Sequence, residues 1–206
     1  MFPAYKADFS ALSASSAVNT PKIDCVLAVT GASGAIYAKT LIEYLYKKGL
    51  SVQCLVSNVG EKVWEWEIGR PISEMLPPEI AVYGEDDWRA PVASGSVMAG
   101  AMVIIPCSMG TLAAVAQGLA RNIIHRAADV MLKEKRPLIL TPRETPLNTI
   151  HLENMLRLAR AGATILPAMP GFYHRPEKIQ DMADFVVGRI LDHLGIEHRL
   201  VKPWGE

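Results

Sequence analysis

Two kinds of hydrophobic pattern alternate along almost the whole chain. Short and nearly continuous apolar runs predict buried strands at 23–29, 52–56, 102–105, 138–141 and 164–166. Apolar residues at helical spacing predict helices at 35–48, 59–68, 112–118, 124–134, 147–161 and 176–194. Strands that alternate with helices in this way form a parallel sheet covered by helices on both faces. The pattern therefore predicts an α/β fold.

The segment 69–100 interrupts this alternation. Prolines at 71, 77, 78 and 91, together with small polar residues at 93–96, predict loops with short helical pieces. We expect no further strand there.

Length and composition predict one domain with a short extension. Half of the 206 residues are hydrophobic, which is enough to bury a sizeable core, and we expect a single domain at 22–206. The first residues are rich in Ala and Ser, with one lysine, no arginine and no long apolar core. This composition predicts a disordered leader at 1–21 rather than a signal peptide.

The charge balance argues against several classes of partner. Lysine plus arginine equals aspartate plus glutamate, at 21 each, so there is no general basic field for a nucleic acid or an anionic membrane. The longest apolar runs fall far short of the roughly 20 residues that span a bilayer. Cys25, Cys54 and Cys107 form no CxxC pair, and the five histidines show no metal-ligand spacing. We expect a soluble, cytoplasmic protein with reduced thiols and no metal site.

Candidate chemistry gathers where two predicted strands end. The run at 23–29 leads into Gly31-Ala32-Ser33-Gly34, and the run at 138–141 leads into Arg143 and Glu144. Open α/β sheets bind their ligands in the crevice beyond the carboxyl ends of the strands. Two strand ends are therefore expected to bracket one site.

The loop at 31–34 is suited to hold a phosphate, because small residues let backbone amides approach an anion at a helix N-terminus. It is not a GxGxxG loop, and Ser57-Asn58 stands where a dinucleotide site needs an acidic residue. These features weigh against NAD and are compatible with a mononucleotide such as FMN. A tight turn without a ligand is the alternative. We expect the small polar loops at 94–96 and 108–111 to converge on the same sheet edge.

Charged residues suggest a second anion site. The candidate phosphate-binding side chains are Arg126, Lys133, Arg143, Arg175 and Arg189. Glu144 is a candidate proton donor, with a simple ion pair as the alternative. Glu67 is a second carboxylate candidate, although by itself it is better explained as a solvated residue at a helix end.

Three aromatic residues lie in loop-like contexts. Trp88, Tyr173 and Trp204 have Gly or Pro nearby, unlike core aromatics in periodic runs. They are candidates to line an apolar ligand pocket. Trp204 suits a subunit contact equally well.

Seven motifs, taken together and in order, resemble the UbiX family of flavin prenyltransferases. They are TGASGA at 30–35, DWRAPVASGS at 87–96, PCSMGTL at 106–112, RAADVMLK at 126–133, PRETPL at 142–147, HLENM at 151–155 and PGFYHRP at 170–176. The resemblance covers residues 23–206. It implies a Rossmann-like, flavodoxin-type three-layer fold assembled into a homododecamer, with sites shared between subunits.

The resemblance also implies an activity. A dimethylallyl group would pass from dimethylallyl phosphate to N5 and C6 of reduced FMN, without a metal ion. The product, prenylated FMN, would serve UbiD-type decarboxylases.

Residue roles follow from the matching motifs. FMN would be held by Gly31, Ala32, Ser33, Ser57, Ala93, Ser94, Ser108, Thr111 and Arg126. The allylic phosphate would be held by Lys133, Arg143, Glu144, Tyr173 and Arg189. Catalysis would involve four residues: Glu144 and Lys133 would help the phosphate leave, and Ser33 and Glu67 would move protons at the flavin. Trp88 and Trp204 would wall the prenyl pocket.

Two rival readings remain from the sequence. The related flavoproteins that decarboxylate cysteinyl peptides share the fold, but their PASANT-type and PxMNxxMW-type motifs are replaced here at 91–96 and 145–153. A flavin carrier that binds and delivers FMN is the second rival.

Overall fold

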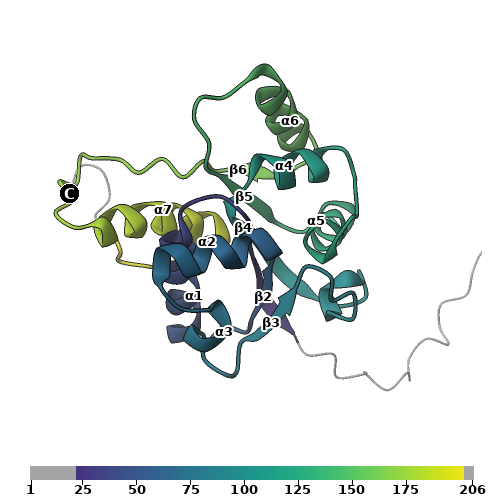
Figure 1. Ribbon diagram of the computed structural model, residues 1–206, viewed down its shortest axis with the longest axis horizontal. Coiled ribbons are helices and arrows are strands. Elements are labelled where there is room, and N and C mark those ends of the chain that lie inside the picture. The colour runs from purple at the N-terminus through teal and green to yellow at the C-terminus, as the bar shows by residue number, and fades with distance from the viewer. Residues whose placement is uncertain (1–21, 202–206) are drawn as a thin grey trace, which may run out of the picture.

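The computed structural model describes residues 22–201, which form a three-layer α/β unit around a six-stranded sheet (Figure 1). All of the strands are parallel and follow the order β3-β2-β1-β4-β5-β6. This is the strand order of the Rossmann fold, so the predicted Rossmann-like parallel sheet is confirmed. The leader expected at 1–21 lies outside the described residues.

The strands are β1 (Ile23–Val29), β2 (Val52–Val56), β3 (Ala81–Gly84), β4 (Ala99–Cys107), β5 (Leu138–Pro142) and β6 (Thr164–Ile165). The central strands are apolar throughout because both of their faces are buried. In β1, Leu27 and Val29 belong to the core on one face of the sheet, and Val26 and Ala28 belong to the core on the other face.

The helices are α1 (Ala35–Lys47), α2 (Asn58–Ile68), α3 (Ile72–Met75), α4 (Met109–Ala116), α5 (Ile123–Lys133), α6 (Thr149–Arg160) and α7 (Ile179–Leu194), and η1 (Pro91–Ala93) is a short 3-10 turn. Helices α1, α2, α3 and α7 lie on one face of the sheet, and α4, α5 and α6 lie on the other (Figure 1). Within residues 22–201, no helix combines the length and the hydrophobicity that a bilayer crossing requires.

The expectation of no strand within 69–100 is wrong. β3 has four residues, lies at the edge of the sheet and pairs only with β2. Its side chains are only half-buried, so that the sequence lacks the continuous apolar run of a central strand. Helix α7 also begins later than predicted, at Ile179, because the Asp181 carboxylate accepts hydrogen bonds from the backbone N–H groups of Glu177 and Lys178.

The strand order reverses between β1 and β4. In open α/β sheets, ligands bind in the crevice beyond the carboxyl ends of the strands at such a switch point. The connection from β3 to β4 contains no α-helix. Instead, the segment 85–98 runs along α5: the N–H of Ile123 donates to the carbonyl of Glu85, and Arg136 donates to the carbonyl of Val97. The segment therefore starts at the carboxyl edge of the sheet and reaches its amino edge before β4 begins.

Candidate active site

Thr30 joins the carboxyl ends of β1 and β4. Its buried hydroxyl donates to the carbonyl oxygen of Pro106 at 2.8 Å and accepts a hydrogen bond from the N–H of Ser108 at 2.7 Å. A polar side chain at the end of an apolar strand is stable here because both hydrogen-bonding capacities of the hydroxyl are used. Thr30 thus fixes the spacing of the two loops that border the crevice. In the sequence, Thr30 stands out only as the first residue of the TGASGA motif.

Two serines begin the helices that leave this edge. Ser57 accepts a hydrogen bond from the N–H of Gly60 at 2.9 Å and is the N-cap of α2. Ser108 is the N-cap of α4, where it accepts from the N–H of Thr111 at 3.2 Å and lies 3.1 Å from the Thr111 hydroxyl. The backbone N–H of Ser57 donates to the carbonyl of Val29, which places α2 beside β1. These expected FMN contacts therefore lie at the carboxyl ends of β2 and β4, on either side of β1.

The side chain of Glu67, from the last turn of α2, lies at the N-terminus of α1. Its carboxylate accepts hydrogen bonds from the N–H groups of Gly34 and Ala35, at 2.9 and 2.8 Å. Partial burial raises the pKa of the Glu67 carboxyl, but hydrogen bonds from Ser33, Gly34 and Ala35 and the positive charge of Arg143 outweigh burial and lower the pKa overall. The interpretation of Glu67 as a merely solvated helix-end residue is wrong. Because Glu67 uses the amides at the start of α1, an incoming phosphate does not find them free.

Arg143 connects the end of β5 to the same loop. Its Nε donates to the carbonyl oxygen of Ser33 at 3.0 Å, and its backbone N–H donates to the carbonyl of Cys107. Ser33, Glu67 and Arg143, which are far apart in the sequence, are thus brought together at the crevice. Glu144 follows Arg143 and is exposed at the same edge, and its carboxylate accepts from the N–H of Thr145.

Tyr37 is a further member of this cluster and was not predicted from the sequence. A Cβ atom at Gly34, where φ is +120°, would lie 2.8 Å from the Tyr37 ring, so the ring packs directly against the turn. Burial raises the pKa of the Tyr37 hydroxyl, and the negative charge of Glu67 adds to this effect while Arg143 opposes it. The sequence feature that could have pointed to Tyr37 is its position three residues after Gly34, in the first turn of α1.

The charge of Glu67 yields a prediction about pH. A carboxyl whose pKa is lowered by folding stabilises the protein above its unfolded pKa, and this contribution is lost as the pH falls through the folded pKa. We expect Glu67→Gln to lower the free energy of unfolding by about 1 kcal/mol at pH 7, the usual size of a carboxylate at a helix N-terminus. Denaturant unfolding of the two proteins should show this difference shrinking below about pH 4. A difference that is the same at all pH values would contradict the role of the charge.

A second group of predicted residues lies along α5. Arg126 donates from Nε to the carbonyl of Ala93 at 3.0 Å and pairs with Asp129 at 2.7 Å. Arg136, just after α5, donates to the carbonyls of Val97 at 2.7 Å and Gly95 at 2.9 Å. The two arginines therefore hold the segment 93–97 in place through its backbone. Arg136 gave no sequence signal, since nothing in a sequence shows which carbonyls a guanidinium will find.

Lys133 ends α5 and lies over the same segment. Its ammonium forms an ion pair with Glu134, which lowers the pKa of the Glu134 carboxyl. A Cβ atom at Gly95 would come within 2.8 Å of Lys133 Nζ, so the absence of a side chain at Gly95 lets the lysine cross the turn. The hydroxyls of Ser94 and Ser96 share a hydrogen bond of 2.8 Å in this turn.

The expected convergence of three polar loops on one edge is wrong for a single chain. The loops at 31–34 and 108–111 meet at the carboxyl edge through Thr30, but 94–96 lies just before β4, at the amino edge. The physical reason is the helix-free connection after β3, which carries the chain back along α5. Lys133 and Ser94 are thereby separated from Arg143 and Glu144.

We expect Arg136→Ala to lower the free energy of unfolding by about 2 kcal/mol, because two part-buried carbonyls lose charge-assisted hydrogen bonds. Arg89→Ala is the matched control, since its side chain is 94% exposed and the change should cost less than about 0.5 kcal/mol. Chemical denaturation measures both values. Equal effects of the two substitutions would show that Arg136 does not hold the segment.

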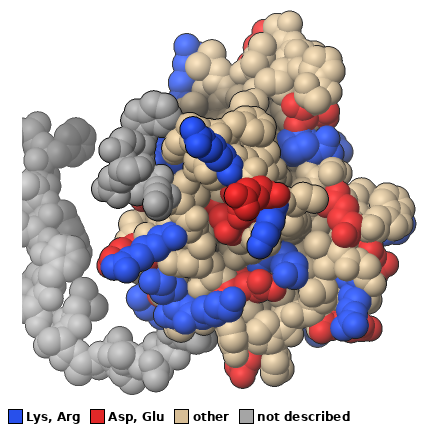
Figure 2. Space-filling view, turned by 90° about the vertical axis from the view of Figure 1, so that its left-hand side faces the viewer, with Lys and Arg blue, Asp and Glu red and all other residues tan. Residues whose placement is uncertain are grey.

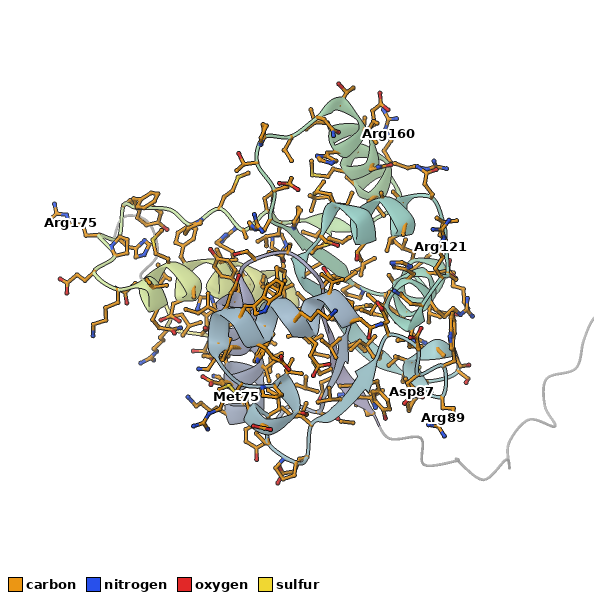
Figure 3. The ribbon with its side chains drawn as sticks, viewed as in Figure 1. Met75, Asp87, Arg89, Arg121, Arg160 and Arg175 are labelled. Carbon is orange, nitrogen blue, oxygen red and sulfur yellow. The ribbon has the colours of Figure 1, made fainter. Side chains whose placement is uncertain are left out.

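The remaining predicted residues form a third group. Tyr173 lies with its ring centroid 5.7 Å from those of His174 and Phe185, at the first half of α7, and Arg189 pairs with Asp192 further along the same helix. Figure 3 shows Arg175 extending from the tip of the segment before α7, on the opposite side of the molecule from Asp87 and Arg89. Trp88 is 48% exposed. Trp204 lies outside the described residues.

Within residues 22–201, no group of three or more His, Cys, Asp or Glu side chains lies close enough to hold a metal ion. The three cysteines are free and buried, and burial raises the pKa of the Cys25 and Cys54 thiols to about 12. Unreactive thiols of this kind belong to the core.

The chain matches known proteins over most of its length. A sequence profile described as Flavoprotein matches residues 13–191. The flavin prenyltransferase UbiX of Halalkalibacterium halodurans is 50% identical over 188 residues, which cover 86% of this chain and 91% of the relative. The chain belongs to the UbiX family of flavin prenyltransferases. The UbiX protein of Pseudomonas aeruginosa is 48% identical over 194 residues, covering 87% of this chain and 93% of that protein.

Solved structures of UbiX proteins agree with the fold. The crystal structure of AnUbiX (PadA1) in complex with FMN and dimethylallyl pyrophosphate is 39% identical and has a TM-score of 0.86, covering 90% of this chain and 98% of that one. A dodecameric FMN-dependent UbiX-like decarboxylase from Escherichia coli O157:H7 is 38% identical with a TM-score of 0.85, covering 89% of this chain and 100% of that one. A phosphopantothenoylcysteine (PPC) decarboxylase is 21% identical with a TM-score of 0.58, and it shares the fold alone.

Proposed function

We propose that this UbiX-family chain is a flavin prenyltransferase that transfers a dimethylallyl group from dimethylallyl phosphate to N5 and C6 of reduced FMN. The observation that carries the proposal is the cluster of Ser33, Glu67 and Arg143 at the β1/β4 switch point, with Glu144 beside it. In this cluster the Glu67 carboxylate, whose pKa is lowered, and the Arg143 guanidinium both bind the backbone of residues 33–35. Relatives with 48–50% identity are named flavin prenyltransferases.

The residues at the crevice fit a flavin mononucleotide. The end of β2 carries Ser57-Asn58, with no carboxylate for a dinucleotide ribose. The Ser57 hydroxyl accepts a bond from Gly60 and keeps its hydrogen for donation to a ligand. When bound, reduced FMN supplies the nucleophilic ring atoms. The chain would hold it through Gly31, Ala32, Ser33, Ser57, Ala93, Ser94, Ser108, Thr111 and Arg126.

The donor's phosphate would be held by cationic and hydroxyl groups. An allylic phosphate leaves as an anion, so its departure is favoured by positive charge and by a proton donor at the leaving oxygen. We propose Lys133, Arg143, Tyr173 and Arg189 as the phosphate-binding residues and Glu144 as the proton donor, with Lys133 assisting. Ser33 and Glu67, which share a hydrogen bond, would exchange a proton near the flavin. Trp88 and Trp204 would line the prenyl pocket.

We propose that the site forms between subunits. Within one chain Lys133 lies at the amino edge of the sheet and Arg143 at its carboxyl edge, so that no single chain assembles the whole set. The upper part of the face in Figure 2 is mostly free of acidic and basic side chains. Exposed apolar residues suited to subunit contacts occur on and near α6, at Leu147, Ile150, Leu152 and Leu156. A homododecamer, as in the E. coli relative, would bring such groups together.

The product would be prenylated FMN for a UbiD-type decarboxylase, and we propose a cytoplasmic location. The three buried free thiols support a reducing compartment.

One experiment separates this function from its two rivals. The protein loaded with oxidised FMN is offered a peptide ending in cysteine, and the protein loaded with reduced FMN under anaerobic conditions is offered dimethylallyl phosphate. Carbon dioxide release and flavin modification are measured in both cases. Flavin modification with the second substrate alone supports the prenyltransferase. Carbon dioxide release from the peptide would support the cysteine decarboxylase, and neither reaction would support a carrier.

A further inference from the structure

The guanidinium of Arg189 forms an ion pair within its own helix, α7. Arg189 Nη1 donates to Oδ2 of Asp192, one turn further along α7, at 2.7 Å. Both side chains are about half exposed, at 56% and 47%. An exposed pair of this kind contributes little to stability, so stability does not explain it.

The other oxygen of Asp192 is held by the segment after α7. His198 Nε2 lies 3.0 Å from Asp192 Oδ1, and the N–H of Leu200 donates to His198 Nδ1 at 3.3 Å. Because Nδ1 accepts a hydrogen bond, the ring proton of a neutral His198 is on Nε2, where it donates to Asp192. The His198 side chain is only 11% exposed. We call Asp192 and His198 the C-terminal clip.

The fold makes room for this clip. A Cβ atom at Gly188 would come within 2.9 Å of His198 Cε1, so only glycine leaves space for the imidazole. The same segment is tied to α1, because the Tyr44 hydroxyl donates to the carbonyl of Glu197 at 3.2 Å. The segment is therefore fixed against α7 by His198 and against α1 by Tyr44.

We propose that Asp192 and His198 are positioning residues that hold the Arg189 guanidinium in one orientation for the donor phosphate. The inference rests on the proposed function of Arg189. A guanidinium recognises phosphate through a planar fork, and a fork held in place before binding loses less freedom when the phosphate arrives. Asp192 occupies one Nη1 donor and leaves the others available. His198 in turn fixes the carboxylate, so that it cannot swing with the arginine.

The test is steady-state kinetics of prenylated FMN formation with varied dimethylallyl phosphate. We expect Asp192→Ala and His198→Ala each to raise the KM for the donor about tenfold, the effect of losing one charge-assisted hydrogen bond, while kcat stays within about twofold. The affinity for FMN should not change. His198→Gln, which keeps an N–H donor at a similar reach, should restore most of the donor affinity. Melting temperatures verify that each variant folds.

Two comparisons distinguish positioning from loosened structure. Tyr44→Phe releases the same segment from α1 without touching Asp192, and it should leave the KM for the donor unchanged. In an Arg189→Ala background, Asp192→Ala should add nothing, because the residue it positions is gone. An unchanged KM in the clip variants, additive effects, or an equal effect of Tyr44→Phe would overturn the inference alone. A wild-type protein that makes no prenylated FMN would overturn the proposed function and this inference with it.

Discussion

Glu144→Gln is expected to abolish most turnover while the protein keeps its flavin. The amide preserves the shape of the side chain but cannot donate a carboxyl proton to the leaving phosphate, and loss of general acid catalysis costs about 10²–10⁴-fold in kcat. Glu144 is exposed at the end of β5 and bonds only locally, to the N–H of Thr145, so the fold should be unaffected. Initial rates and FMN titration measure the two properties separately.

Glu74→Gln, an exposed glutamate on α3, is the matched control and should behave as the wild type. A carrier would retain its function in the Glu144 variant. An unchanged rate, or loss of FMN together with activity, would remove Glu144 from the proposed role.

Two inactive variants are expected to restore activity when they are mixed in one oligomer. Lys133 lies at the amino edge of the sheet and Glu144 at the carboxyl edge, so a shared site must take them from different subunits. In oligomers co-assembled from equal amounts of Lys133→Ala and Glu144→Gln chains, about a quarter of the sites would receive both native residues. Co-expression with two different affinity tags yields the hybrids, whose rates are compared with those of the parents.

The control pair is Arg143→Ala with Glu144→Gln. These residues are neighbours in the chain and reach the same site together, so their hybrids should stay inactive. Equal inactivity of both kinds of hybrid would mean that Lys133 and Glu144 do not combine across subunits.

The central strands were predictable because burial on both faces leaves a continuous apolar run in the sequence. The ends of β1, β2 and β5 follow this rule closely. β3 was not predictable, since an edge strand of four half-buried residues differs little from a loop. The route of the chain after β3 was equally hidden: it depends on which carbonyls Arg126 and Arg136 hold, and such pairings involve residues more than 30 positions apart.

The site was predictable where its residues follow strands. Ser33, Ser57, Ser108 and Arg143 come after apolar runs, and in a parallel sheet such positions share an edge. Glu67 lies at the end of a helix, so the sequence alone gave no reason to place its carboxylate on α1. Lys133 and Arg143 were grouped as candidate phosphate ligands from their charge alone, and the single chain separates them because α5 carries Lys133 to the amino edge of the sheet.

The mass of the flavin tests the central claim most directly. The purified protein is incubated anaerobically with reduced FMN and dimethylallyl phosphate, without added metal, and the flavin is extracted and weighed by mass spectrometry. A gain of one C5H8 unit is the predicted result. Unmodified flavin from protein that is folded and bound to FMN would contradict the assignment.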